Sequence, residues 1–139
     1  MGIFLKEINL KGKTALITGA TKGLGRGTAQ AIAEAGGNII AIGRNQSELN
    51  SLAKDIKKLK VKYTSFNCDV NDYNRMKGFI TKLKKLDILV NNAGTNIPEP
   101  FLNVKKSSME KILNVNTKAA FNVAQLCANQ IIKLKKKQG

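Results

Sequence analysis

Short apolar runs alternate along the chain with longer stretches in which apolar residues recur every three or four positions. The short runs predict buried strands at residues 13–18, 38–42, 61–67 and 86–92. The longer stretches have the periodicity of helices that cover a sheet, and they span residues 25–36, 45–59, 71–85 and about 109–134. A strand–helix pair repeated in this way, with right-handed crossovers, predicts an α/β fold with a doubly wound parallel sheet.

Two of the predicted helices carry an N-terminal capping pattern. Asn45 is followed three residues later by Glu48, and Ser107 is followed three residues later by Glu110. A short polar side chain that precedes an acidic residue at this spacing satisfies backbone N–H groups in the first turn of a helix. We therefore expect helices to begin just after Asn45 and Ser107.

The chain is strongly basic, and this bears on its partners. Its 139 residues fit one domain, and 24 Lys and Arg against 9 Asp and Glu give a net charge of +15. Such a charge attracts polyanions, so nucleic-acid binding is an alternative to consider. However, most of the basic residues are lysines, aromatic residues make up only 5%, and no zinc or helix-turn-helix signature is present. The balance favours solvated lysine surfaces and no specific nucleic-acid partner.

Several function classes are excluded by composition. The chain has no histidine, which removes histidine-based triads and histidine metal sites, and no metal is expected. Cys68 and Cys127 form no CxxC pair and are expected to be reduced core residues. No apolar run approaches the roughly 20 residues that cross a bilayer, and the first residues lack a signal-peptide pattern. We expect a cytoplasmic protein with no membrane partner.

The sequence TGATKGLG, residues 18–25, lies between the first predicted strand and the first predicted helix. Gly19 allows the chain to turn at the strand end, while Gly23 and Gly25 remove side chains where the backbone approaches a ligand or another element. The N–H groups at the start of the following helix favour a pyrophosphate. The spacing is G-x-x-x-G-x-G, which departs from the G-x-G-x-x-G of most dinucleotide folds.

Four motifs in order resemble the short-chain dehydrogenase/reductase family: TGATKGLG, CDV at 68–70, NNAG at 91–94 and the asparagine of LNVNTKAAF at 113–121. The resemblance covers essentially the whole chain. It implies a Rossmann-type sheet with strand order 3-2-1-4 and a set of sites around a dinucleotide. Contacts to the cofactor phosphates and ribose are implied for Gly19, Thr21, Lys22, Gly23, Leu24 and Gly25. The resemblance further implies contacts to the adenine from Asp69 and Val70, a lining role for Asn91 and Ala93, and the active-site role of holding a relay water for Asn116.

The end of the second strand bears on which nicotinamide cofactor is bound. NAD sites place an acidic residue there for the ribose diol, but this strand ends AIGRN and no acidic residue occurs from Asn38 to Ser47. Arg44 is suited to a forked contact with a 2′-phosphate, and Lys22 adds a second positive charge. In the family, basic residues at these places resemble the NADP pattern, so we predict NADP, with NAD as the less favoured cofactor.

The segment YNRMK, residues 73–77, matches the Tyr-x-x-x-Lys pair that this family uses to transfer a proton. In the family that pair follows NNAG by roughly 60 residues, whereas Tyr73 and Lys77 precede NNAG. We therefore interpret the match as coincidental. No tyrosine follows NNAG in this chain, and Ser107 and Ser108 precede Asn116, so the family's catalytic Ser, Tyr and Lys are missing.

These observations predict that residues 1–139 form a single NAD(P)-binding domain, equivalent to a truncated, N-terminal half of a reductase. The predicted activity is NADP-dependent interconversion of a carbonyl and an alcohol, on a 3-oxoacyl thioester or a sugar or polyol. Alone, the chain is predicted to be inactive and to self-associate, and the resemblance implies a homo-oligomer. A non-catalytic dinucleotide-binding or interaction module is the alternative, and a basic nucleic-acid-binding protein is a less favoured one.

Overall fold

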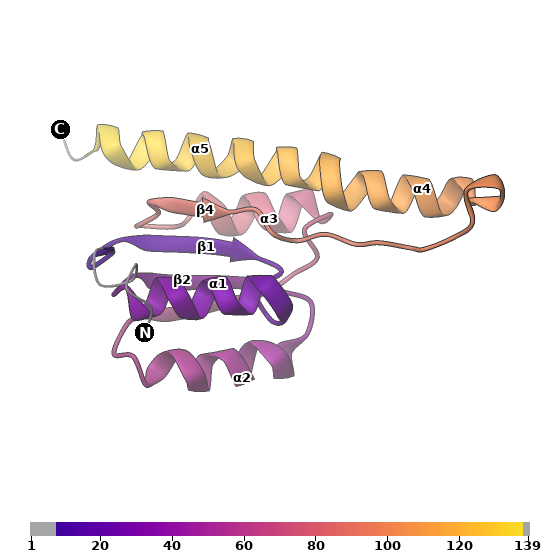
Figure 1. The fold of residues 1–139 in the computed structure, drawn as a ribbon. Helices are drawn as coiled ribbons and strands as arrows, with labels where there is room; N and C mark the ends of the chain where they lie inside the picture. The colour runs from indigo at the N-terminus through magenta and orange to yellow at the C-terminus, as the bar shows by residue number, and fades with distance from the viewer. Residues whose placement is uncertain (1–7, 138–139) are drawn as a thin grey trace.

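The computed structural model describes residues 8–137, and Figure 1 shows a parallel sheet flanked by helices. The four strands are β1 (Thr14–Thr18), β2 (Asn38–Gly43), β3 (Tyr63–Asn67) and β4 (Ile88–Val90). The α-helices are α1 (Gly23–Glu34), α2 (Gln46–Lys57), α3 (Tyr73–Ile80), α4 (Lys106–Leu113) and α5 (Ala120–Lys136). A 3₁₀ turn, η2 (Phe101–Asn103), precedes α4, and a π-helical segment, η3 (Asn114–Ala119), joins α4 to α5.

The strand order is β3-β2-β1-β4, and every pairing is parallel. Leu16 of β1 is aligned with Ile40 of β2 on one side and with Leu89 of β4 on the other. Since β1 is the first strand of the chain and lies between β2 and β4, the crossover direction reverses at β1. In open α/β sheets this switch point is where the strand ends leave room for a ligand. The predicted fold class and strand order are confirmed.

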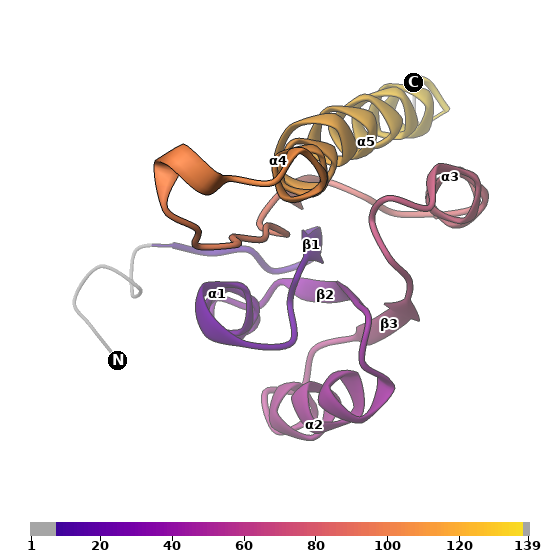
Figure 2. The ribbon, with the colours of Figure 1, turned by 90° about the vertical axis from the view of Figure 1, so that its right-hand side faces the viewer.

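Helices cover both faces of the sheet, as Figure 2 shows with α1 and α2 on one side and α3 and α5 on the other. The alternation of side chains along a strand explains the two layers. From β1, Ala15 and Ile17 pack in the core that includes α1 and α2. Leu16, between them, points to the opposite core, where Met76 of α3 and Val123 of α5 are buried. β1 and β2 are buried almost throughout because both of their faces are covered, whereas β3, at the edge of the sheet, carries polar and partly exposed residues.

Two predicted helix boundaries are confirmed or corrected by the contacts at the helix ends. Asn45 caps α2 as predicted, since its side-chain oxygen accepts from the backbone N–H groups of Ser47 at 2.9 Å and Glu48 at 3.2 Å. The capping box predicted at Ser107 is wrong. The N-cap is Lys105, whose backbone N–H donates to the Glu99 carboxylate at 3.2 Å, so α4 begins before Ser107.

Helices α2 and α3 end earlier than the periodicity predicts. Leu59 lies beyond the end of α2 and is 37% exposed. In α3 the helix ends at Ile80, whereas the prediction extended to residue 85. The carbonyl oxygen of Leu83 instead accepts a hydrogen bond from the Gln130 side chain of α5 at 2.7 Å. Leu83 still packs against the core, so the apolar spacing is satisfied by a turn rather than by a continued helix.

Candidate functional site: a dinucleotide cleft at the switch point

The loop between β1 and α1 turns sharply at Gly19, against the end of β4. The φ angle of Gly19 is +61°, and a Cβ there would lie 3.0 Å from both the Cα of Ala93 and the side-chain nitrogen of Asn92. Helix α1 then begins at Gly23 with Lys22 as its N-cap. The backbone N–H groups of a first helical turn have no partner within the helix, so they are suited to bind an anion.

Gly25 allows α1 to approach this loop closely. A Cβ at Gly25 would overlap the carbonyl oxygen of Gly19 and the side-chain nitrogen of Asn92. That nitrogen donates to the carbonyl oxygens of Thr18 and Gly19, each at 3.1 Å. The third glycine of the motif therefore leaves room for a hydrogen bond that joins the loop to β4.

Thr18 makes a second connection between the end of β1 and the segment after β4. Its hydroxyl oxygen accepts from the backbone N–H groups of Asn92 at 3.0 Å and Ala93 at 2.9 Å. Thr18 is fully buried, so both hydrogen bonds are shielded from water. The carboxyl ends of β1 and β4 are held together at the point where the sheet opens.

A cavity of about 630 Å³ lies at these strand ends. Its lining comes from the β1–α1 loop, the end of β2, the segment after β3, and the segment after β4. Among the predicted site residues, the lining includes Gly19, Thr21, Lys22, Arg44, Asp69, Val70 and Ala93. Gly23, Leu24, Gly25, Asn91 and Asn116 are not in its lining. The structure thus brings together seven residues that lie up to 74 positions apart in the sequence.

Both predicted phosphate-binding cations border this cavity. Lys22 and Arg44 are exposed, and they come from adjacent segments, the β1–α1 loop and the β2–α2 turn. No acidic residue ends β2, but Glu48 of α2 also borders the cavity. The two cations give this end of the cavity the charge that a phosphate group requires.

Asp69 closes a local turn after β3. Its Oδ1 atom accepts from the backbone N–H of Asn71 at 2.9 Å and from the Asn71 side chain at 3.1 Å. The neighbouring Cys68 is buried, and burial raises the pKa of its thiol. The turn therefore holds the Asp69 carboxylate at the cavity wall beside an unreactive thiol.

Asn116 lies in the π-helical segment η3, where each backbone hydrogen bond spans five residues instead of the four of an α-helix. Its Oδ1 atom accepts from the backbone N–H of Thr95 at 2.7 Å, and its side-chain nitrogen donates to the Thr95 carbonyl at 2.9 Å. Thr95 lines the cavity. Single π-helical turns are frequent at functional sites, and here the turn directs Asn116 to the segment after β4.

Asn91 and Asn92 have different positions despite being adjacent. The side-chain nitrogen of Asn91 donates to the carbonyl oxygen of Ala120 at 2.6 Å, so it joins β4 to α5. Asn92 lies in the cavity wall. The sequence reasoning selected Asn91 and missed Asn92. It also assigned no role to Thr18 and Cys68, although both lie inside recognised motifs, and it missed Thr95, which directly follows NNAG.

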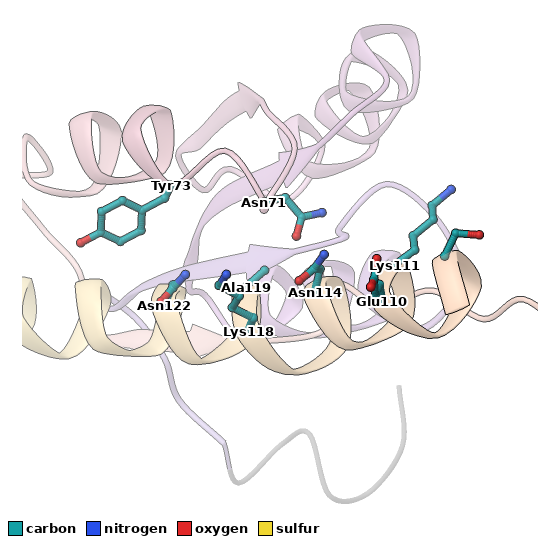
Figure 3. A pocket seen from close by; sticks show the side chains of 9 residues that line it. Asn71, Tyr73, Glu110, Lys111, Asn114, Lys118, Ala119 and Asn122 are labelled. Atoms are coloured by element: carbon teal, nitrogen blue, oxygen red, sulfur yellow. The ribbon is translucent and has the colours of Figure 1, made fainter. Parts of the chain in front are cut away.

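A second cavity, of about 580 Å³, lies between the start of α3 and the α4–η3–α5 rod, and Figure 3 shows its side chains. Tyr73 lies across this space from the end of the rod that carries Asn122, and Asn71 lies across from Asn114. Asn71 and Lys111 border both cavities, but Tyr73 borders only this one. The tyrosine of YNRMK is thus separate from the cleft at the switch point.

Within residues 8–137 no group of three or more His, Cys, Asp or Glu side chains is arranged to hold a metal ion. In the same range, no helix is both long and apolar enough to cross a membrane.

A glycine-rich turn, a helix N-terminus and a cavity at a switch point define a dinucleotide-binding α/β domain. The family model described as short chain dehydrogenase matches residues 13–139. The chain therefore belongs to the short-chain dehydrogenase/reductase family, as the motifs predicted.

Named relatives agree with this assignment. Human L-xylulose reductase is 33% identical over 126 residues, covering 91% of this chain and 50% of that protein. The 3-oxoacyl-[acyl-carrier-protein] reductase of Thermotoga maritima is 33% identical over 130 residues, covering 91% of this chain and 53% of that protein. A structure of NAD⁺-bound xylitol dehydrogenase superposes with a TM-score of 0.85 at 28% identity, covering 89% of this chain and 50% of that one. The chain spans about half the length of these relatives.

Proposed function

We propose that this chain is the cofactor-binding part of an NADP-dependent oxidoreductase that interconverts a carbonyl and an alcohol. The observation that carries the proposal is that Lys22 and Arg44 border one cavity with the glycine turn at Gly19. A 2′-phosphate needs cations at the ribose end, and an NAD site would place an acidic residue at the end of β2 instead. The residues present fit NADP.

Each part of the cavity has a proposed role. Backbone N–H groups from Gly19 to Gly25 would hold the pyrophosphate, and Leu24 would cover its ribose side. Lys22 and Arg44 would hold the 2′-phosphate through charge-assisted hydrogen bonds. Asp69 and Val70 would contact the adenine, and Ala93 would border the nicotinamide end.

Asn116 has a proposed role in proton transfer. Its two hydrogen bonds to Thr95 hold it beside the segment after β4. We infer that it positions a relay water there and that Asn91 supports the same region from α5. When bound, the cofactor supplies the hydride acceptor or donor, and the protein supplies binding and orientation.

The substrate we propose is a small carbonyl or alcohol, either a 3-oxoacyl thioester or a sugar or polyol. Support comes from the named activities of the relatives, an L-xylulose reductase and a 3-oxoacyl-[acyl-carrier-protein] reductase. We further propose a cytoplasmic location, which the buried free thiols of Cys68 and Cys127 support. A homo-oligomer is proposed on the exposed apolar surface described below.

The cofactor proposal is tested with nucleotides that occupy only the adenosine end. Adenosine 2′,5′-bisphosphate should bind the 139-residue chain about tenfold or more tightly than 5′-AMP, because only the former meets both cations. Arg44→Asp should erase this difference, while Lys82→Asp, the same charge change at an exposed site outside the cavity lining, should not. Isothermal titration calorimetry measures both. An unchanged bisphosphate-to-AMP ratio in Arg44→Asp would exclude the 2′-phosphate assignment.

We propose that residues 1–139 alone bind the nucleotide without reducing carbonyls. Among these residues no tyrosine follows Asn116, so no Tyr-x-x-x-Lys pair is present at the position where the family uses one to donate a proton to the developing alkoxide. The test is NADPH oxidation with a panel of sugars, polyol-derived ketones and 3-oxoacyl thioesters. Turnover above the protein-free rate would contradict this proposal.

The same polypeptide should self-associate. Within the described residues β4 pairs only with β1, so its other edge offers unpaired backbone groups to another chain. Phe101, Leu102 and Phe121 add apolar surface, since these residues are 91%, 90% and 66% exposed. Light scattering on the purified chain should give a mass above that of a monomer. A monodisperse monomer at micromolar concentration would argue against this expectation.

A further inference from the structure

Arg26 joins the β1–α1 loop to helix α2. It lies in the first turn of α1, and its Nη1 atom donates to the carbonyl oxygen of Thr21 at 3.2 Å. Its Nη2 atom donates to Asp55 at 2.6 Å and to the Ser51 hydroxyl at 3.1 Å, both on α2. One guanidinium therefore connects a loop backbone atom to a helix that is 25 to 29 residues away in the sequence.

Asp55 is itself held in place for this contact. Gln30 of α1 donates to the same carboxylate oxygen at 3.4 Å. The Arg26 and Asp55 side chains are 24% and 36% exposed, so the pair is partly shielded. The hydrogen bond from Arg26 lowers the pKa of Asp55 below its ordinary value. The aspartate is therefore ionised at neutral pH, and the guanidinium has a fixed anionic partner.

Thr21 is fixed on its other side by the end of β2. A Cβ at Gly43 would lie 2.5 Å from the Cγ2 methyl of Thr21, so Thr21 packs directly over the glycine. Thr21 is 7% exposed. Its carbonyl is held by Arg26 and its methyl by Gly43. Lys22 directly follows Thr21, and Arg44 directly follows Gly43.

We propose that Arg26 and Asp55 form a positioning pair that sets the spacing of Lys22 and Arg44, and so determines how strongly the cleft prefers an adenine nucleotide with a 2′-phosphate. This inference rests on the proposed NADP function. Lys22 follows Thr21 in the β1–α1 loop, and Arg44 lies just before α2. The pair connects these two segments, because Arg26 binds the Thr21 carbonyl and Asp55 lies on α2. If the connection is broken, a ligand that needs both cations loses affinity, whereas a ligand without the 2′-phosphate does not.

The two physical explanations of an effect at Asp55 differ in sign. Replacing Asp55 by Asn removes a negative charge near the proposed phosphate site. Coulomb's law alone then predicts tighter binding of an anion. Loss of positioning predicts the opposite, weaker binding of the 2′-phosphate. The matched control is Glu48→Gln on the same helix, which removes the same charge from a residue that borders the cavity and makes no contact with Arg26 among the described hydrogen bonds and ion pairs.

The experiment is titration of the 139-residue chain with adenosine 2′,5′-bisphosphate and with 5′-AMP. Asp55→Asn should weaken the bisphosphate about three- to tenfold and change 5′-AMP by less than about twofold, since part of a charge-assisted contact is lost. Glu48→Gln should bind the bisphosphate more tightly than wild type. Arg26→Lys keeps the charge but cannot bridge Thr21 and Asp55 together, and should behave like Asp55→Asn. It also serves as the second variant if Asp55→Asn fails to fold.

Other outcomes would overturn the inference. Tighter bisphosphate binding by Asp55→Asn would show that only its charge matters. Equal weakening of both nucleotides would show that the pair supports the loop without affecting the preference. If wild type itself shows no preference, the NADP proposal fails.

Amide hydrogen exchange then tests the pair separately. Asp55→Asn should speed exchange about tenfold or more in residues 20–24 and not in β1. Unchanged exchange would exclude the positioning role.

Discussion

The side-chain nitrogen of Asn92 donates to the carbonyl oxygen of Gly19 at 3.1 Å. This contact joins the start of the β1–α1 loop to the segment after β4, so this wall of the cleft is built by two segments more than 70 residues apart. The loop shape thus depends on the segment after β4 as well as on its own glycines.

Thr18→Val should destabilise the fold by roughly 2–4 kcal/mol, because the backbone N–H groups of Asn92 and Ala93 would lose their buried acceptor. The substitution keeps the side-chain shape, so packing changes little. Urea denaturation measures the change. Thr64→Val, on an exposed position of β3, is the matched control and should alter stability by less than about 0.5 kcal/mol. Equal effects of the two substitutions would contradict the described contacts.

Gly25→Ala should destabilise the chain by about 1–3 kcal/mol or more and abolish nucleotide binding, because the new Cβ would overlap the Gly19 carbonyl. Gly27→Ala is the control two residues further along the same helix. A Cβ there meets nothing within 4 Å, so the better helix propensity of Ala should stabilise α1 by up to about 1 kcal/mol. Thermal melts and nucleotide titrations of both variants distinguish these cases, and a neutral Gly25→Ala would refute the close approach.

Tyr73→Phe should leave adenine-nucleotide affinity within about twofold of wild type, since Tyr73 borders the second cavity and not the cleft. Lys77→Gln should behave in the same way. In any longer, active protein that contains these residues, turnover should likewise persist in both variants. A hundredfold loss of turnover in a folded Tyr73→Phe protein would instead place this tyrosine in proton transfer.

The contribution of Asp55 to stability should disappear in acid. Arg26 holds the pKa of Asp55 below its ordinary value of 3.8. A carboxyl whose pKa is lowered on folding stabilises the protein above its unfolded pKa, and this contribution is lost as the pH falls through the folded pKa. Wild type should therefore exceed Asp55→Asn in stability by a constant amount near neutral pH. The urea midpoints of the two proteins should approach each other as the pH falls below 3.8 and through the lowered pKa of folded Asp55. A difference that does not shrink at all on acidification would contradict the ion pair.

Nucleic-acid binding should be weak and independent of sequence despite the net charge of +15. Counterion release predicts that any affinity falls steeply between about 50 and 200 mM salt. Fluorescence anisotropy with labelled duplex and single strands of several sequences provides the measurement. Submicromolar binding with a sequence preference at physiological salt would overturn this prediction.

The strands and most of the cleft could be predicted from sequence because their signals are local. A parallel strand covered on both faces is apolar throughout, so TALIT and NIIAI were recognisable. The glycine motif was recognisable because positive φ and close approach exclude side chains. The charge at Lys22 and Arg44 was also visible, and the fold then brought both to one cavity.

The rest depended on contacts between distant segments. The end of α3 was missed because the Leu83 carbonyl is bonded to Gln130 of α5, and the start of α4 was missed because Glu99 binds the backbone of Lys105. Nothing near Arg26 in the sequence indicates that this side chain donates a hydrogen bond to the Thr21 carbonyl, or that it is paired with Asp55. Local periodicity and backbone preference determined which segments became strands, helices and turns. Only tertiary structure decided which side chains meet across them, because hydrogen bonds and ion pairs act over a few ångströms in space, however far apart their residues lie along the chain.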